Sequence, residues 1–195
     1  MPKNSRKKSK FAVTIIIILM LALSVIALIY AKKIVETRLY PLKYQSLVEA
    51  AAEKHSVEPS LIYAVIRSES SFNPNATSRA NAKGLMQITD QTYDWLRRMR
   101  KEPTTENHSD LYDPSVSIEY GAYYLSYLCG EFKHWENALA AYNAGPTNAK
   151  KWLENESTAA DGKLITENIP FPETRKYVQK VLDAKKIYEL LYYKN

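Results

Sequence analysis

The sequence predicts an all-α domain that follows one N-terminal transmembrane helix. Three observations lead to this fold class. Residues 11–31 form an uncharged apolar run, and a helix that spans a bilayer needs about 20 such residues. Beyond residue 42, apolar side chains recur at three- and four-residue spacing, and no stretch shows the alternation of a strand. Proline and glycine separate these amphipathic stretches, which is typical of consecutive helices joined by turns.

The positive charge of the chain is concentrated at its N-terminus. Five of the 27 Lys and Arg residues lie in residues 1–10, which leaves 22 basic against 21 acidic residues in the rest. This nearly neutral body lacks the basic surface that nucleic-acid binding requires. The single cysteine, Cys129, excludes an intramolecular disulfide and a multi-cysteine zinc site, and its apolar neighbours predict a small buried hydrophobe.

The apolar run at 11–31 is predicted to be an uncleaved anchor. The alternative is a cleaved secretory signal, whose apolar core is usually only about 7 to 15 residues and ends at a small-x-small site. Here the run ends Ile29-Tyr30-Ala31, so that site is poor, and no cysteine follows for a lipid anchor. Five basic residues precede the run and three follow it, so the positive-inside rule places the N-terminus in the cytoplasm.

These observations divide the chain into four parts. We expect a cytoplasmic basic tail at 1–10, the anchor at 11–31, a juxtamembrane linker at 32–41 and a folded domain at 42–195. The chain is then a single-pass protein of the cell membrane, with its folded domain outside the cytoplasm.

The first three helices of the domain are expected at 44–54, 59–69 and 89–100. The first has an apolar stripe, and Pro59 suits the first position of the second. Either Thr89 or Asp90 can cap the third. Polar stretches at 75–83 and 101–111 read as loops.

Four more helices are expected in the second half of the chain. Asp113-Pro114 starts one that reaches about Phe132, and Gly145-Pro146 ends a short helix over 135–143. A helix at 147–154 and a small-residue loop at 157–162 precede the last one, which is amphipathic and reaches about residue 192.

Glu69 is the first candidate for chemistry. At helical spacing it lies on the same face as Ile62, Val65 and Ile66. A carboxyl against apolar surface is either paired or has a raised pKa, and the second case describes a general acid. Alone this signal is weak, because a glutamate near the end of a helix usually faces solvent.

Four motifs strengthen that hypothesis. They are Glu-Ser-x-Phe-Asn-Pro at 69–74, Gly-Leu-Met-Gln at 84–87, Ala-Tyr-Asn-Ala-Gly-Pro at 141–146 and Ile-Pro-Phe-x-Glu-Thr-Arg-x-Tyr-Val at 169–178. In this order they resemble the motifs of the soluble lytic transglycosylase catalytic domain, over about residues 42–192. The resemblance implies a goose-lysozyme-like α fold and makes 42–195 the catalytic domain.

The resemblance also implies an activity. The family cleaves the β-1,4 bond between N-acetylmuramic acid and N-acetylglucosamine of peptidoglycan strands without water, leaving a 1,6-anhydro end. Glu69 would be the catalytic acid and then the base. The implied substrate-binding residues are Ser70, Met86, Gln87, Tyr142, Asn143 and Glu173. Ser70 is equally explained as a helix cap, Asn143 as support for a turn, and Glu173 as a partner of Arg175.

Two departures from the family pattern stand out. Asn81-Ala82 replaces the usual Gly-Ala, and asparagine tolerates the positive φ that such a turn requires. Thr89-Asp90 replaces a common Met-Pro, which makes that wall of the groove more polar.

Two other functions remain open at this stage. A lysozyme-like muramidase on the same fold would use a second carboxylate to activate water, and Glu173 is the candidate. An idle wall-binding module of a cell-wall synthesis, division or secretion complex would need no acid, and the intact Glu69, Gln87 and Tyr142 argue against it. No cofactor or metal is predicted, because the three histidines lack ligand spacing and no phosphate-binding glycine loop is present.

Overall fold

The computed structural model describes residues 3–103 and 107–194, with side chains from residue 14 onward. It divides into two compact units, Met1–Pro41 and Leu42–Asn195. The start of the predicted tail, residues 1–2, and residues 104–106 of the predicted loop lie outside the described residues.

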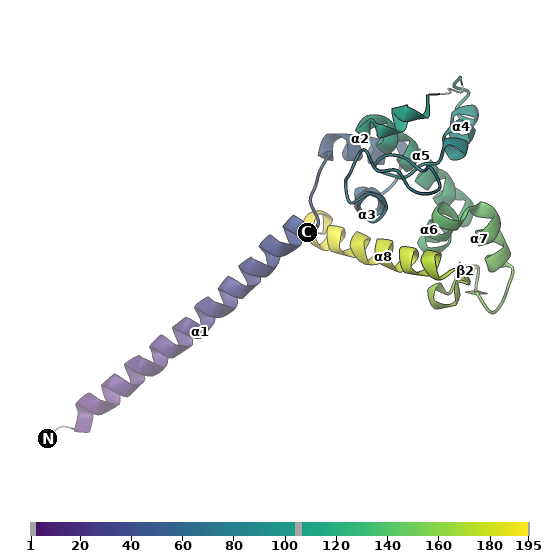
Figure 1. The fold of residues 1–195 in the computed structure, drawn as a ribbon. Helices are drawn as coiled ribbons and strands as arrows, with labels where there is room; N and C mark the ends of the chain where they lie inside the picture. The colour runs from purple at the N-terminus through teal and green to yellow at the C-terminus, as the bar shows by residue number, and fades with distance from the viewer. Residues whose placement is uncertain (1–2, 104–106, 195) are drawn as a thin grey trace. The chain divides into compact units, whose positions relative to one another are not determined.

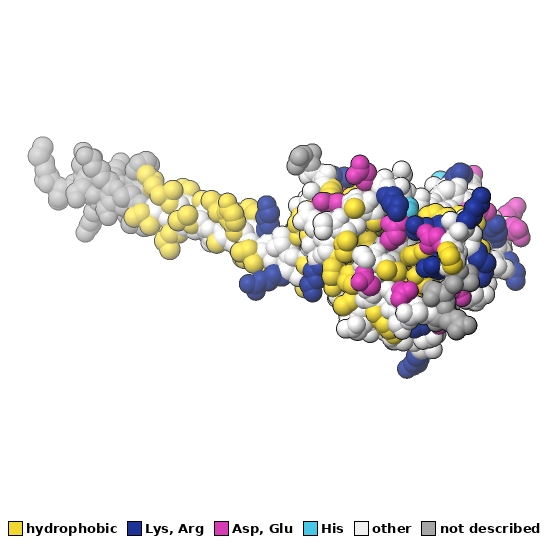
Figure 2. Space-filling view, turned by 90° about the horizontal axis from the view of Figure 1, so that it is seen from above, with side chains coloured by type: hydrophobic (Ala, Val, Ile, Leu, Met, Phe, Trp, Pro, Cys, Tyr) yellow, Lys and Arg dark blue, Asp and Glu magenta, His cyan; other side chains and the backbone are white. Residues whose placement is uncertain are grey.

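The first unit is one continuous helix, α1 (Lys3–Leu39), so the predicted linker is helical over most of its length. From Thr14 to Leu39 this helix is long and apolar enough to cross a membrane. Hydrophobic side chains lie along the coloured part of this helix in Figure 2, and many are exposed, such as Leu28 with 70% of its surface accessible. The roles assigned to its segments remain predictions.

The second unit is helical, which confirms the predicted fold class (Figure 1). Its α-helices are α2 (Gln45–His55), α3 (Pro59–Glu69), α4 (Asp90–Met99), α5 (Pro114–Phe132), α6 (Trp135–Ala144), α7 (Pro146–Leu153) and α8 (Pro172–Tyr188). Short 3-10 turns η1 (His108–Tyr112) and η2 (Thr166–Asn168) and a π turn η3 (Glu189–Tyr193) complete the helical part.

The core is built around α3. This helix packs along α8 and also touches α2 and α5, while α5 packs on α2 and α6, and α6 packs on α7 and α8. Every side chain from Leu61 to Ile66 is fully buried. A helix that is apolar on all sides belongs inside a domain. Because α3 crosses the core, its last residue, Glu69, emerges from the interior rather than from the surface.

Side-chain caps fix where two helices begin. Thr89 accepts from the backbone N–H of Thr92 at 3.2 Å and is the N-cap of α4, so of the two predicted caps it is Thr89 that acts. Asp113 caps α5, accepting from the Ser115 hydroxyl at 2.5 Å and from the backbone N–H groups of Ser115 at 2.7 Å and Val116 at 3.3 Å. These bonds hold the pKa of Asp113 below its usual range.

The sequence predicts no strands, but the described part of the chain contains one short two-stranded sheet. A short antiparallel hairpin begins inside the predicted small-residue loop with β1 (Ala159–Ala160) and ends just beyond that loop with β2 (Lys163–Leu164). Asn137 of α6, which is buried, donates to Gly162 O at 2.8 Å and accepts from Leu164 N at 2.8 Å. A tertiary contact therefore stabilises strands too short to show a sequence pattern. The predicted loop at 101–111 likewise includes the start of η1.

Candidate active site

Glu69 is the last residue of α3, and the chain turns sharply after it. Ser70 ends the helix, with both its N–H (3.0 Å) and its hydroxyl (3.1 Å) donating to Ile66 O. Ser71 and Phe72 follow with φ of 51° and 66°. Consecutive non-glycine residues in this left-handed region are strained, and such strain concentrates at functional sites. Ser70 therefore acts here as the cap that the sequence left as its alternative.

The Glu69 carboxyl is largely surrounded by protein, although part of the residue remains exposed. Burial is the largest influence on it and raises its pKa to about 7. Among the residues from 14 to 103 and 107 to 194, no Lys, Arg or His forms an ion pair with it. A carboxyl with this pKa is close to half protonated near neutral pH, which suits a general acid.

Three side chains of α8 influence the charge state of Glu69. Tyr177 is buried, and its hydroxyl makes no hydrogen bond within ordinary limits in the described structure, yet it lies close enough to the carboxyl to favour the charged form. Lys180 donates to Ser68 O at 2.9 Å, and its charge lowers the pKa of Glu69. Glu173 is exposed and its charge raises that pKa. These smaller effects modulate the dominant effect of burial.

Tyr142 approaches from α6. Its hydroxyl donates to Met86 O at 2.7 Å, and its ring lies 5.1 Å from that of Tyr124. Burial, followed by the nearby Glu69 charge, raises the pKa of Tyr142 well above its usual value. Tyr142 is therefore a neutral hydroxyl, held in place and within electrostatic reach of the acid.

Met86 is buried rather than open to a ligand. Its side chain has no exposed surface and packs on Gly121, where a Cβ atom would come within 2.1 Å of its sulfur. Its backbone N–H donates to Ser117 Oγ at 3.1 Å. In this conformation Met86 reaches the site only through the carbonyl that holds Tyr142. A substrate contact by its thioether remains a prediction.

Gln87 lies in the loop between α3 and α4 with a positive φ of 49°. Its side-chain amide donates to Gly84 O at 3.0 Å and to Ala76 O at 3.1 Å, so its nitrogen stabilises the loop itself. Gly84 has φ of 76°, and a Cβ there would lie 1.8 Å from Leu111 O. Asn81 has φ of 58°, which confirms that asparagine accommodates the turn. The expected closeness of Gln87 to Glu69 remains a prediction.

Of the remaining predicted residues, Asn143 has a hydrogen-bond partner, whereas Glu173 has no ion-pair partner among the described residues. Asn143 accepts from Thr174 Oγ1 at 2.7 Å, which ties α6 to α8. Arg175 donates through Nη2 to Ile169 O at 2.9 Å. No ion pair joins Arg175 to Glu173 among the described residues, so Glu173 remains available beside the acid.

A cavity of about 630 Å³ adjoins this site. One wall is α4 with its cap, contributing Thr89, Thr92, Trp95 and Arg98, and the opposite wall runs through Tyr142 to the start of α7. Trp95 stands edge-on to Tyr124 at 6.0 Å. Tyr142 lines this wall and also lies within electrostatic reach of Glu69, so the two regions share one residue. The volume of the cavity is in the range of small-molecule sites.

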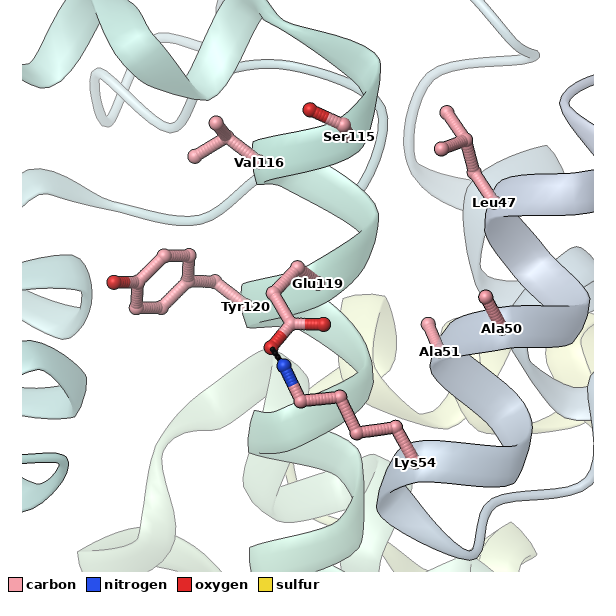
Figure 3. A pocket seen from close by; sticks show the side chains of 8 residues that line it. All are labelled: Leu47, Ala50, Ala51, Lys54, Ser115, Val116, Glu119 and Tyr120. Atoms are coloured by element: carbon pink, nitrogen blue, oxygen red, sulfur yellow. Dashed lines mark hydrogen bonds and ion pairs between the residues drawn. The ribbon is translucent and has the colours of Figure 1, made fainter.

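A second cavity, of about 420 Å³, lies between α2 and α5 (Figure 3). Leu47, Ala50 and Ala51 face it from α2, and Lys54 reaches across to Glu119 of α5 at 2.6 Å. Arg100 donates to the same carboxyl oxygen at 3.0 Å. The partnered carboxylate has a lowered pKa despite partial burial. This cavity therefore contains an ion-pair network rather than a reactive acid.

The family of the chain follows from its sequence as a whole. The Transglycosylase SLT domain family matches residues 46–165, which is more than half of the chain and includes Glu69, Gln87 and Tyr142. The chain belongs to this family. Its predicted resemblance is thereby confirmed, together with the fold class.

Curated relatives share a third of their aligned residues with the chain. The soluble lytic murein transglycosylase of Escherichia coli (strain K12) is 36% identical over 146 residues, covering 73% of this chain and 22% of the relative. The membrane-bound lytic murein transglycosylase C of Pectobacterium atrosepticum is 32% identical over 166 residues, covering 75% and 46%. The chain thus spans only about a fifth to a half of the length of these two relatives.

Solved structures agree on the fold. An inactive mutant of the lytic transglycosylase Slt from Pseudomonas aeruginosa matches with a TM-score of 0.70 at 35% identity, over 77% of this chain and 24% of that one. A 70-kDa soluble lytic transglycosylase in complex with bulgecin A matches with a TM-score of 0.76 at 32% identity, over 82% and 26%. The second unit therefore has the lysozyme-like fold of these enzymes.

Sequence reasoning does not single out three side chains that bear on the site. Tyr177 reads as a core position on the apolar stripe of α8, Lys180 as a solvated charge and Trp95 as one aromatic residue of an amphipathic helix. Tyr177 does stand inside the fourth motif, so a polar group at a core position there was the available signal. Lys180 and Trp95 carry no such signal.

Proposed function

We propose that this chain is a membrane-anchored peptidoglycan lytic transglycosylase. It cleaves the bond between N-acetylmuramic acid and N-acetylglucosamine without water and leaves 1,6-anhydro ends. The observation that carries the proposal is the Glu69 carboxyl, which is buried at the end of a core helix, has no ion-pair partner among the described residues and has a pKa raised to about 7. Membership of the Transglycosylase SLT domain family supports it.

One carboxyl is sufficient for this reaction. Protonated Glu69 gives its proton to the glycosidic oxygen as the bond from that oxygen to the muramic acid C1 breaks. The carboxylate then accepts the proton of the muramic acid 6-hydroxyl, and the oxygen of this hydroxyl forms the new bond to C1. No water is consumed, and the accepted proton leaves Glu69 protonated again for the next cleavage. A pKa near 7 suits both steps, because neither protonation state is strongly disfavoured.

The neighbouring hydroxyls are suited to bind the sugar. Tyr142 is held by Met86 O, and Tyr177 carries a buried hydroxyl without an ordinary hydrogen-bond partner in the described part of the chain. Leaving a buried hydroxyl unpaired costs about 1–3 kcal/mol, so a substrate oxygen or the Glu69 carboxyl would gain by pairing with it. We assign both tyrosines to positioning the acid and the N-acetyl group of the substrate, with Gln87 and Asn143 nearby.

Relatives support the same chemistry. The similar proteins are named lytic murein transglycosylases. The Pseudomonas aeruginosa structure is described as an inactive mutant in which glutamine replaces a glutamate. This is the result expected of an enzyme that depends on a glutamic acid.

A muramidase is the second candidate, and one observation keeps it open. Glu173 is exposed, lies near enough to Glu69 to raise its pKa and has no ion-pair partner among the described residues. A hydrolase would use such a carboxylate to activate water. In the transglycosylase, Glu173 only contacts the substrate.

Analysis of the products separates the two functions. Purified peptidoglycan is digested with the full chain in detergent micelles, and the released muropeptides are examined by mass spectrometry. Anhydro-muramic ends support the transglycosylase, whereas reducing muramic ends, 18 mass units heavier by one water, would assign the muramidase. Glu173→Gln sharpens the result: it should abolish a hydrolase but leave the ratio of anhydro product unchanged.

The anchor is a proposal of its own. We place α1 across the membrane, because its side chains from Ile15 to Ala31 are uncharged and exposed. The basic residues that precede this segment favour a cytoplasmic N-terminus. One similar protein is named membrane-bound. Protease treatment of intact cells should remove the second unit, and degradation only after lysis would reverse the orientation. Recruitment by a cell-wall synthesis, division or secretion complex stays a prediction.

A further inference from the structure

The cavity beside Tyr142 contains one charge that the proposed chemistry does not use. Arg98 is the only residue with a formal charge among those that line it. The other lining groups are hydroxyls, amides, aromatic rings and small residues. A single guanidinium in a neutral wall favours an anionic group over a neutral one.

The other arginines of the same helix are already engaged. Arg97 donates through Nη1 to the Tyr93 hydroxyl at 3.1 Å, and Arg100 forms ion pairs with Glu102 at 2.8 Å and Glu119 at 3.0 Å. Arg98 is exposed and has no ion pair or hydrogen bond within the described chain. Its charge is therefore available to a ligand that enters the cavity.

The side chains around Arg98 are held by ring contacts and by a helix cap. Trp95 precedes Arg98 by about one turn of α4. Its ring stands edge-on to that of Tyr127, with 5.0 Å between the ring centroids, and also to that of Tyr124. Tyr124 in turn lies against Tyr142. Thr89, the N-cap of α4, accepts a hydrogen bond from the backbone N–H of Thr92. An aromatic wall thus connects the cation to the surroundings of the acid.

The substrate has one source of negative charge that matches this cation. The sugar rings of a peptidoglycan strand are neutral, and the carboxylates belong to the peptide stems on the muramic acid residues. We propose that Arg98 binds a stem-peptide carboxylate, with Trp95 as the apolar surface under the stem, and so selects strands that carry stems. This inference rests on the proposed function, since it assumes that a glycan strand occupies the groove.

The strength of such a contact sets the loss of affinity expected when Arg98 is replaced. A hydrogen bond to a charged group is stronger than one between neutral groups, but the solvent exposure of Arg98 weakens it. We therefore expect about a tenfold effect on affinity rather than a complete loss. Lysine keeps the charge but not the paired N–H geometry, so Arg98→Lys should retain part of the binding.

The test compares strands with and without stems. One portion of purified peptidoglycan is treated with an amidase that removes the stems, and soluble fragments of both kinds are prepared. Binding is measured with the full chain in detergent, in a Glu69→Gln background, so that the result does not depend on turnover. Arg98→Gln should weaken binding of stem-bearing fragments about tenfold, and of stripped fragments by less than about twofold.

The control removes a similar charge elsewhere. Lys151 is exposed on α7 and does not line the cavity, so Lys151→Gln should leave both affinities unchanged. Equal losses on both substrates with Arg98→Gln, or no loss on either, would overturn the inference. Turnover of the chain with native Glu69 is measured separately. A chain that binds stems through Arg98 but yields no anhydro ends would refute the proposed function while leaving this inference intact.

Discussion

Glu69 and Glu119 are both helical glutamates, and their surroundings have opposite effects. Glu69 is near apolar and aromatic groups, and burial raises its pKa to about 7. Glu119 is partly buried too, which by itself would raise its pKa, but contacts with Lys54 and His55 lower it. The same type of side chain thus has a raised pKa at the end of α3 and a lowered one in the ion-pair network of α5, which Figure 3 shows. Partners, rather than burial alone, decide which role a carboxyl has.

The largest difference between the two glutamates should appear in the rate of the reaction when each is replaced. Glu69→Gln removes the proton donor while keeping the shape, and general acid catalysis contributes about 10²- to 10⁴-fold, so the rate of anhydro-product release should fall by that factor. Glu119→Gln is the matched control at the second cavity and should keep at least half of the rate. Comparable losses in both variants would mean that Glu69 is not the acid.

At pH 8, replacing Glu119 should destabilise the fold, whereas replacing Glu69 should stabilise it. Glu119→Gln leaves Lys54 and Arg100 without their anion and should lower the free energy of unfolding by about 1–3 kcal/mol. Glu69→Gln removes a buried charge that is disfavoured at this pH and should raise it by about 2 kcal/mol. Urea unfolding followed by tryptophan fluorescence measures both. The signal reports on the second unit, because Trp95, Trp135 and Trp152 all lie there.

The two carboxyls should also give stability opposite pH dependences. Because the folded state raises the pKa of Glu69 above the unfolded value of about 4.3, its stabilising contribution is complete below that value and is lost as pH rises through about 7. The lowered pKa of Glu119 stabilises above its unfolded value, and this contribution is lost as pH falls through the folded pKa. The unfolding curves of the two variants should therefore diverge from the native chain in different pH ranges. Parallel curves would contradict the assignment.

Activity should have an alkaline limb set by Glu69. Since the protonated form starts the reaction, kcat/KM should fall about tenfold for each pH unit above about 7. Glu119→Gln should leave this limb in place. A limb centred near pH 4.5 would show that the carboxyl titrates as an ordinary exposed glutamate.

The smallest effect concerns the charges around the acid. Lys180→Met removes a nearby positive charge and should move the alkaline limb upward by a few tenths of a pH unit, whereas Glu173→Gln should move it downward. Lys176, exposed on the same helix, provides the control, and Lys176→Met should cause no shift. Shifts in the same direction for Lys180 and Glu173 would exclude a direct electrostatic effect.

The helices are the part of the molecule that sequence patterns predict well. Proline at the start of α3 and α5, the caps at Thr89 and Asp113, and the glycine between α6 and α7 are local signals, and the structure places helix ends at them. The hairpin at 159–164 has no such signal, because Asn137 stabilises it from a distant helix. Local chemistry therefore predicts element boundaries, and tertiary contacts decide where the local preference is weak.

The candidate site, too, is predicted partly by the sequence and partly only by the tertiary structure. The sequence by itself determined that Glu69 ends an apolar helix and that four motifs accompany it, because residue spacing and residue type are properties of the chain. Only the tertiary structure decided that Met86 packs against Gly121 and that Ser70 caps the helix. It also decided that Tyr177 and Lys180 influence Glu69 and that Arg98 lines the cavity. The pKa of a carboxyl depends on groups brought together from α3, α6 and α8, and no local pattern contains that information.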